Sequence, residues 1–229
     1  MLKFAPFILA LLYAFAMFKF SAWNSKRALD ANSSPLRDPR LDQLNSDMAN
    51  ALDLPRIKVN VYEVEPVNGL AAPDGRIFIT RGFLNKYKNG EVSAEEIASV
   101  VAHELGHVAL GHSRRRMIDF SGQNAMKVLM AGLIGRFIPF IGPWVANMVT
   151  SLLAARLSRR DEYEADAYAS ALMTKAGIGT EPQKSLFRKL DKLAGVGGRG
   201  PTAWLMSHPK TEDRIAAIEA NEAKWMPPT

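Results

Sequence analysis

The sequence predicts an α+β fold that is mainly helical and has a small antiparallel sheet. Two short segments with alternating apolar residues, 57–61 and 76–80, are expected to form strands, with a turn at residues 73–75 before the second. Longer segments with apolar residues at helical spacing dominate the chain after residue 93. About 200 of the 229 residues follow an apolar N-terminal segment, which is the size of one compact domain.

Apolar spacing together with start and stop signals predicts five helices. The first ends before Pro55, and the second begins at a capping box formed by Ser93 and Glu96. The third ends at Gly177, and the fourth precedes a glycine-rich loop at residues 194–200. The expected ranges are 41–52, 93–108, 157–176 and 183–193, with a last helix that begins at Thr211.

The second of these helices carries the sequence His103-Glu104-Leu105-Gly106-His107. Residues four apart lie on one side of a helix, so the rings of His103 and His107 can share one ion. Glu104 is turned by about 100 degrees from His103 and borders the site, where a general base should sit. This pattern is typical of catalytic zinc sites in peptidases. A structural metal site or a chance pair of histidines is the alternative, and the acidic helix downstream argues against it.

The third predicted helix carries the candidate third ligand. Glu162 and Asp166 are four residues apart and share a face, whereas Glu164 is turned by about 200 degrees from Glu162. We assign Glu162 to zinc and Asp166 to a hydrogen bond with a ligand imidazole, His103 or His107, because such carboxylates orient metal-bound histidines. Simple solvation of the helix is the alternative for the acidic residues, and it suits Glu164 and Asp161.

His112 lies five residues after His107 and does not complete another known ligand set. A metzincin would need glycine and histidine where the chain has Leu110 and Ser113. His112 is therefore expected to be a structural group, or a support for a ligand on the same helix.

Four segments, in this order, resemble one family. They are 77–82, the motif at 103–107, the acidic motif at 162–166, and Ser207-His208-Pro209 followed by Arg214. Together they resemble the gluzincin zinc metallopeptidases of the HtpX, CAAX prenyl protease and BepA type, over roughly residues 35–220. The resemblance implies a zincin-type metallopeptidase domain at 35–225.

The resulting functional prediction is a zinc-dependent endopeptidase that cleaves internal peptide bonds of membrane-associated or envelope proteins. One Zn²⁺ per chain would be held by His103, His107 and Glu162, with Glu104 as the general base. His208 is the candidate for stabilising the oxyanion or for occupying the open zinc position in a resting state. The alternative is a catalytically silent protein of the same fold with a binding or chaperone-like role at the membrane.

A strand edge near the motif is the candidate substrate-binding segment. It contains Asn68, Gly69 and Leu70, and a peptide could add to it as a further strand. Relatives often have Asn-Ala-Phe-Ala where this chain has Asn-Gly-Leu-Ala, so the resemblance does not determine its subsite preference. Arg214 is a second, weaker candidate for contact with substrate or for stabilising charge.

Composition limits the partners. The chain has no cysteine, which excludes disulfides, thiolate ligands and a cysteine nucleophile. Its net charge is +6, yet no aromatic platform or nucleic-acid motif accompanies the basic clusters. Anionic membrane lipid is therefore an expected partner, and nucleic acid is not. The resemblance implies protein or peptide substrates. The sequence does not indicate an oligomeric state.

Two apolar regions bear on location. Residues 1–20 are expected to be a signal peptide or a membrane anchor, followed by a linker at 21–34. Residues 128–155 are expected to form an apolar hairpin, which either covers the cleft or dips into lipid. The expected location is the bacterial inner membrane, with an N-terminal anchor or signal that places the catalytic domain in the periplasm. An exported soluble protein and a domain facing the cytoplasm are the alternatives.

Overall fold

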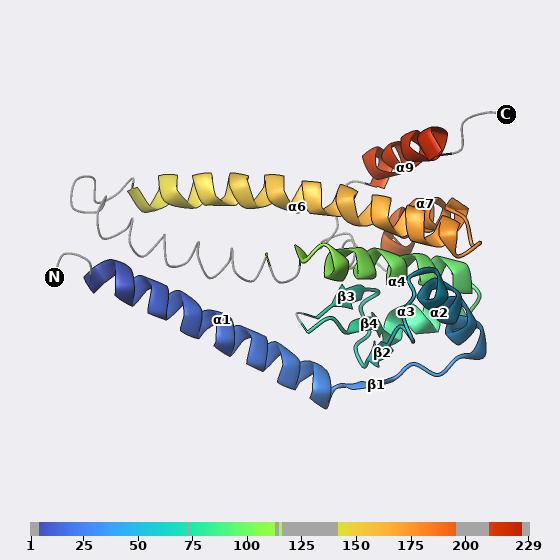
Figure 1. Cartoon of the computed structure of the whole chain (residues 1–229), viewed down its shortest axis with the longest axis horizontal. Coiled ribbons are helices and arrows are strands. Elements are labelled where there is room, and N and C mark those ends of the chain that lie inside the picture. The colour runs from blue at the N-terminus through green and yellow to red at the C-terminus, as the bar shows by residue number, and fades with distance from the viewer. Residues whose placement is uncertain (1–4, 73, 113–114, 116–141, 196–210, 226–229) are drawn as a thin grey trace.

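The computed structural model describes residues 5–72, 74–112, 115, 142–195 and 211–225. Most of them are helical, and Figure 1 shows the helices gathered around a small sheet, with two long helices extending from one end of the molecule. The helices are α1 (Ala5–Ala31), α2 (Pro39–Ala51), α3 (Arg81–Lys88), α4 (Ala94–Ala109), α6 (Gly142–Lys175), α7 (Glu181–Gly195) and α9 (Thr211–Trp225). The mainly helical α+β prediction is confirmed.

The sheet has four strands in the order β1-β2-β4-β3. Its strands are β1 (Ser33–Pro35), β2 (Val59–Tyr62), β3 (Gly69–Ala71) and β4 (Ile77–Thr80). It is mixed, whereas the sequence predicts an antiparallel one, because β2 and β4 run parallel with Val59 opposite Ile77. After β2 the chain forms an antiparallel hairpin of β3 and β4. The strand that pairs with β2 is β4, and β3 lies at the edge of the sheet.

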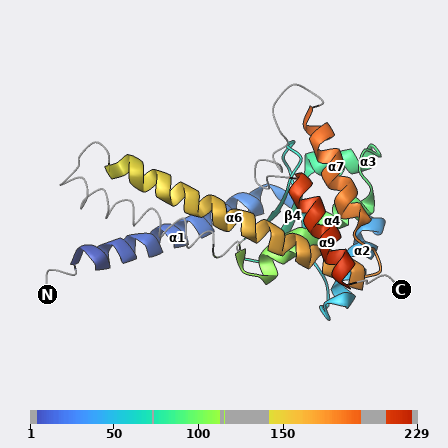
Figure 2. The same ribbon diagram turned by 90° about the horizontal axis from the view of Figure 1, so that it is seen from above.

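The motif at residues 103–107 lies on the helix at the centre of the molecule. Helix α4 contacts the sheet through β3 and β4, and it also contacts α2, α6 and α7. The view from above shows α6, α7 and α9 together beside α4 (Figure 2). Helix α4 is therefore enclosed, and Ile97, Val100 and Ala102 are each at most 2% exposed. Helix α3, which begins at Thr80 as its N-cap, is an element that the sequence analysis does not predict.

The N-terminal region is a single helix. Helix α1 covers most of the predicted segment at 1–20 and continues through most of the predicted linker at 21–34. Among the described helices, none is both long enough and apolar enough to cross a membrane. The division of the chain at residue 20 stays a prediction. In the predicted hairpin at 128–155, residues 128–141 lie outside the described part, and the backbone from Gly142 onward belongs to α6.

Candidate metal centre

The start of α4 is fixed by the predicted capping box. The Ser93 hydroxyl accepts from the amide of Glu96, and the Glu96 carboxylate accepts from the amide of Ser93. Glu96 is buried, and its carboxylate also binds the Ser185 hydroxyl at 2.7 Å and Lys189 Nζ at 2.9 Å, both on α7. The cap therefore holds the helix start and joins it to a neighbouring helix, which helps to set the position of the motif that begins about two turns after Glu96.

The structure brings the three predicted ligands together. His103 and His107 on α4 place their Nε2 atoms 3.1 Å apart. Glu162 on α6 lies 3.4 Å from His103 Nε2 through Oε2 and 3.5 Å from His107 Nε2 through Oε1. All three side chains are buried, and their donor atoms could hold one metal ion. The triangle joins residues 55 positions apart along the chain.

Gly106 allows α6 to come this close. A Cβ added at Gly106 would lie 3.0 Å from the Cα and the carbonyl oxygen of Ala165 and 3.2 Å from Cβ of Tyr168. Because backbone atoms cannot swing aside as a side chain can, any larger residue would push α6 away. The glycine between the two histidines therefore sets the distance from Glu162 to both rings.

His103 is supported by a buried ion pair. Its Nδ1 lies 2.9 Å from Asp166 Oδ1, and Asp166 also binds Arg214 of α9 at 2.6 Å and 2.7 Å. Burial alone lowers the pKa of His103, but hydrogen bonds that its ring donates to the carboxylates of Asp166 and Glu162 outweigh burial and raise that pKa to about 9. Burial raises the pKa of Asp166, and the charge of Arg214 more than reverses this, so Asp166 stays ionised.

Glu104 is buried on the side of α4 that faces β3. A Cβ added at Gly69 would lie 3.7 Å from Cγ of Glu104 and would collide with the side chain of Val100. Gly69 thus lets β3 lie against α4. β3 is an edge strand whose described partner is β4. Just before it, the Oδ1 atom of Asn68 is buried and has no hydrogen-bond partner among the described residues.

A second cluster of polar groups adjoins the first. His112 Nδ1 lies 3.0 Å from His107 Nδ1, and its Nε2 lies 3.2 Å from Glu164 Oε2 and 3.6 Å from Asp161 Oδ1. Asp161 is only 2% exposed, so it does not solvate the helix as expected. As helix geometry predicts, Glu164 stays out of the ligand triangle, but it meets His112 instead.

The sequence as a whole matches known peptidases. The profile described as Peptidase family M48 matches residues 35–222. The chain belongs to peptidase family M48. It is 30% identical to the metalloprotease LoiP of Escherichia coli K12, over 78% of this chain and 68% of that protein.

Relatives at lower sequence identity are also proteases. The chain is 26% identical to a protease HtpX homolog of Bordetella pertussis, over 93% of this chain and 80% of that protein. It is 21% identical to the human mitochondrial metalloendopeptidase OMA1, over 70% of this chain and 31% of that protein. The expected family is confirmed. As a member of the M48 family, this protein is a metal-dependent peptidase that acts on proteins or peptides.

Arg214 and His208 are the two remaining site residues predicted for this M48 protein. Arg214 is 1% exposed, pairs with Asp166 and stacks on Phe187 with its guanidinium 4.5 Å from the ring centre. It therefore lies behind the ligands, not at an open surface. His208 lies outside the described residues, so its expected role stays a prediction.

Gln183 also contacts this site, although no sequence pattern indicates it. Gln183 on α7 donates from Nε2 to Asp166 Oδ1 at 3.4 Å, and it accepts from the Ser170 hydroxyl at 2.8 Å. A glutamine near the start of an amphipathic helix carries no signal of this kind in the sequence.

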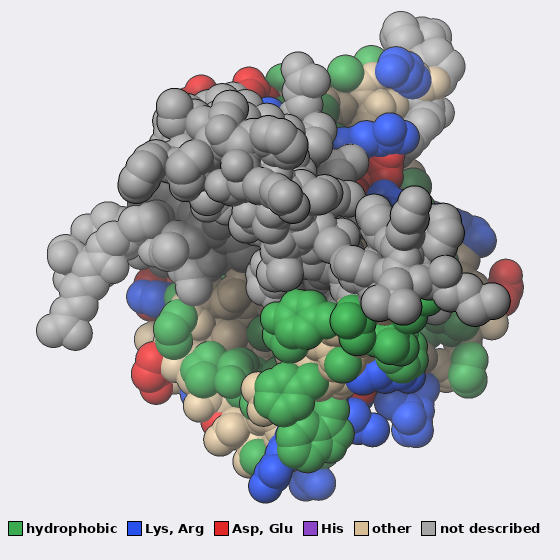
Figure 3. Space-filling view, turned by 90° about the vertical axis from the view of Figure 1, so that its left-hand side faces the viewer, with side chains coloured by type: hydrophobic (Ala, Val, Ile, Leu, Met, Phe, Trp, Pro, Cys, Tyr) green, Lys and Arg blue, Asp and Glu red, His purple; other side chains and the backbone are tan. Residues whose placement is uncertain are grey.

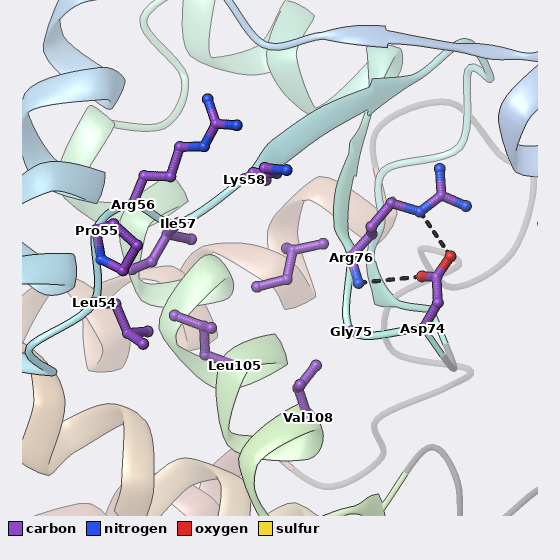
Figure 4. Close-up of a pocket in the computed structure, with 11 residues that line it drawn as sticks. Leu54, Pro55, Arg56, Ile57, Lys58, Asp74, Gly75, Arg76, Leu105 and Val108 are labelled. Carbon is purple, nitrogen blue, oxygen red and sulfur yellow. Dashed lines mark hydrogen bonds and ion pairs between the residues drawn. The ribbon is translucent and has the colours of Figure 1, made fainter.

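The M48 domain also has a pocket of about 610 Å³ on another side of α4 (Figure 4). Leu105 and Val108 of α4 form part of its wall, opposite Leu54 and Ile57 from the connection between α2 and β2. The turn at residues 74–76 closes one end, where Arg76 pairs with Asp74 at 2.8 Å. Leu105 is turned by about 200 degrees from His103 on the helix, so this pocket and the ligand triangle use different faces of α4.

Proposed function

We propose that this protein is a zinc-dependent metalloendopeptidase whose single Zn²⁺ is held by His103, His107 and Glu162. The observation that carries the proposal is the convergence of these donor atoms. The two histidine Nε2 atoms lie 3.1 Å apart, and Glu162 places Oε2 3.4 Å from His103 Nε2 and Oε1 3.5 Å from His107 Nε2. Ligands placed tetrahedrally about 2.0–2.2 Å from zinc lie about 3.3–3.6 Å from one another, so the carboxylate contacts match this spacing and the two imidazoles lie slightly closer. Two imidazoles and a carboxylate also match the donor types of catalytic zinc, and they leave one position for substrate.

Glu104 is the proposed general base. Bound zinc would polarise the scissile carbonyl and acidify water at the site. Glu104 takes a proton from the attacking water and delivers it to the leaving amine. Its position next to His103 and its burial beside β3 support this role. Asp166 and Arg214 hold the ring of His103 from behind. His208 is proposed to stabilise the oxyanion.

The proposed substrate-binding segment comprises Asn68, Gly69 and Leu70. β3 is an edge strand beside Glu104, so an extended peptide can pair with it by main-chain hydrogen bonds. The buried Oδ1 of Asn68 is an acceptor, which a substrate amide can satisfy. Cleavage of an internal bond follows because a peptide bound along an edge can extend in both directions.

Membrane lipid is the proposed second partner. Helix α1 exposes large apolar side chains, and hydrophobic groups gather on the end of the molecule seen in Figure 3. The exposed large apolar residues among those described on α1 are Ile8, Leu9, Leu11, Leu12, Tyr13, Phe15, Phe20 and Trp23. Lys19 lies 5.5 Å from the Phe15 ring and Arg27 lies 5.4 Å from the Trp23 ring. Such pairs suit a boundary with anionic headgroups. Sedimentation with anionic vesicles tests this proposal. Absence of binding would refute lipid as a partner, and equal binding after removal of residues 1–20 would refute the role of α1.

Separation of metal binding from catalysis tests the enzymatic proposal. Glu104→Gln should keep one zinc per chain, because the three ligands remain, while peptide cleavage falls by about a hundredfold or more. His103→Ala, His107→Ala and Glu162→Ala should each lose both zinc and cleavage. Zinc content is measured by elemental analysis and cleavage with an unstructured protein substrate.

The outcomes distinguish the alternatives. Loss of zinc from Glu104→Gln, with zinc kept by Glu162→Ala, would reverse the assigned roles of the two glutamates. A wild-type protein that binds zinc but cleaves nothing would match the silent binding or chaperone-like protein. A wild-type protein that contains no zinc at all would contradict the proposed cofactor.

A further inference from the structure

We infer that His112 is a positioning residue for the ligand His107, a role that rests on the proposed metal site. His112 is fully buried, and its Nδ1 lies 3.0 Å from Nδ1 of His107, the ring nitrogen that faces away from the ligand triangle. Its other nitrogen lies 3.2 Å from Glu164 Oε2. His107 is thus joined to a carboxylate of α6 through a second imidazole, whereas His103 contacts its carboxylate directly.

The backbone is shaped to bring this ring into place. On one continuous helix, a residue five positions after His107 would be turned from it by about 140 degrees and would face elsewhere. Instead α4 ends at Ala109, and Gly111 has a positive φ of 70°. This left-handed residue redirects the chain and returns His112 toward His107. A Cβ at Gly111 would meet nothing within 4 Å, so the glycine serves conformation and not packing.

A count of protons gives the direction of the hydrogen bonds. A neutral imidazole that binds metal through Nε2 carries its proton on Nδ1. His107 Nδ1 therefore donates to His112 Nδ1, and a contact between two nitrogens holds only one proton. The proton of neutral His112 is then on Nε2, from which it can donate to Glu164. Each group in the series has the partner that its tautomer requires, which fixes the orientation of the His107 ring.

The same cluster could be read as a second metal site, since His112, Asp161 and Glu164 offer three donor atoms near one another. Two observations oppose that reading. A metal on His112 Nε2 would leave the two imidazoles with a single shared proton and force one of them to become an anion. Both carboxylates also already have cationic partners, Arg115 for Asp161 at 3.4 Å and Arg160 for Glu164 at 2.7 Å.

Zinc affinity of two variants at position 112 tests the inference. His112→Phe keeps a ring but removes the acceptor, so zinc affinity should fall by about 10- to 100-fold, as losses of ligand-orienting groups do. His112→Asn places a carbonyl oxygen at the position of Nδ1, so it should recover most of that affinity. Affinity is measured by competition with a chromophoric chelator, and the absorption bands of Co²⁺-loaded protein report the ligand geometry independently of activity.

A backbone variant provides a second route that leaves His112 unchanged. Gly111→Ala strains a left-handed residue and should turn His112 away, which lowers zinc affinity. Gly90→Ala is the matched control, because Gly90 has a φ of 74° and also nothing within 4 Å of an added Cβ. The two substitutions should cost similar stability, by about 1–2 kcal/mol from the left-handed backbone, and only Gly111→Ala should weaken zinc binding.

The inference is overturned if His112→Phe binds zinc as tightly as the wild type. It is also overturned if His112→Asn and His112→Phe lose affinity equally, or if Gly111→Ala and Gly90→Ala bind zinc alike. Two zinc ions in the wild type, with one lost in each His112 variant, would establish the second metal site in its place. Failure of the proposed function is a separate result, since the wild type itself would then bind no zinc.

Discussion

The two histidines of the motif lie one helical turn apart, yet the structure supports them in different ways. His103 is backed by a closed ion pair, Asp166 with Arg214, in which both side chains are at most 2% exposed. His107 is backed by His112, and that network ends at Glu164, whose side chain is 35% exposed. The support of His103 comes from distant segments of the chain and is buried in the core. The support of His107 begins with His112, five residues further along the chain, and extends to the surface at Glu164. The first should therefore matter more for folding and the second mainly for metal binding.

Arg214→Met should give the largest loss of stability. The substitution leaves the buried Asp166 carboxylate without its cation, and breaking a buried ion pair in this way costs about 3–5 kcal/mol. The free energy of unfolding of the metal-free protein, from urea denaturation, is the measurement. Arg188→Met is the control, because the side chain of Arg188 is 52% exposed and pairs with Glu181 at the surface. That change should cost at most about 1 kcal/mol. Equal losses would mean that the pair behind His103 is no stronger than a surface pair.

Gly106→Ala should have an intermediate effect that reaches both histidines. Its new methyl group would press on the Ala165 backbone at 3.0 Å, and overpacking of this kind costs about 1–3 kcal/mol. Because a shift of α6 carries Glu162 away from both His103 and His107, zinc affinity should fall as well.

Ala109→Gly, an exposed change at the end of the same helix, is the control. It should lose about 0.5–1 kcal/mol through helix propensity and leave zinc affinity unchanged. Unaltered zinc binding in Gly106→Ala would show that the distance between α4 and α6 does not set the ligand triangle.

The part of this site that could be predicted is the part that depends on helix geometry alone. Spacings of four residues determine that His103 and His107 share a face and that Glu162 and Asp166 share another. The same rule excludes Glu164 from the ligand triangle. In the structure Glu164 contacts His112 in the second cluster instead. The capping box at Ser93 likewise involves only residues three apart, and the structure has it as predicted.

The part that could not be predicted depends on contacts between distant segments or on one backbone angle. Arg214 lies 48 residues from Asp166 in sequence, so nothing local indicates that it is buried behind His103. The turn of His112 toward His107 depends on the positive φ of Gly111, and a glycine after a helix is compatible with many paths. In the sheet, the alternation of apolar residues predicts strands but does not show which strand lies beside β2. The parallel pairing of β2 with β4 could therefore not be predicted.

Arg160→Ala should have the smallest effect, and it probes the open end of the His107 network. Arg160 donates to Glu164 at 2.7 Å, and this hydrogen bond is the main reason that the pKa of Glu164 is lowered. The Arg160 side chain is 78% exposed, so solvent and salt screen the pair. The melting temperature should change by about a degree or less, and zinc affinity should stay within about twofold, since His112 and Glu164, which support His107, both remain. Raising the salt concentration should reproduce the effect in the wild type and leave the contrast between Arg214→Met and the wild type intact. A large loss of stability in Arg160→Ala would mean that the second support is as closed as the first, and the difference between the two histidines would disappear.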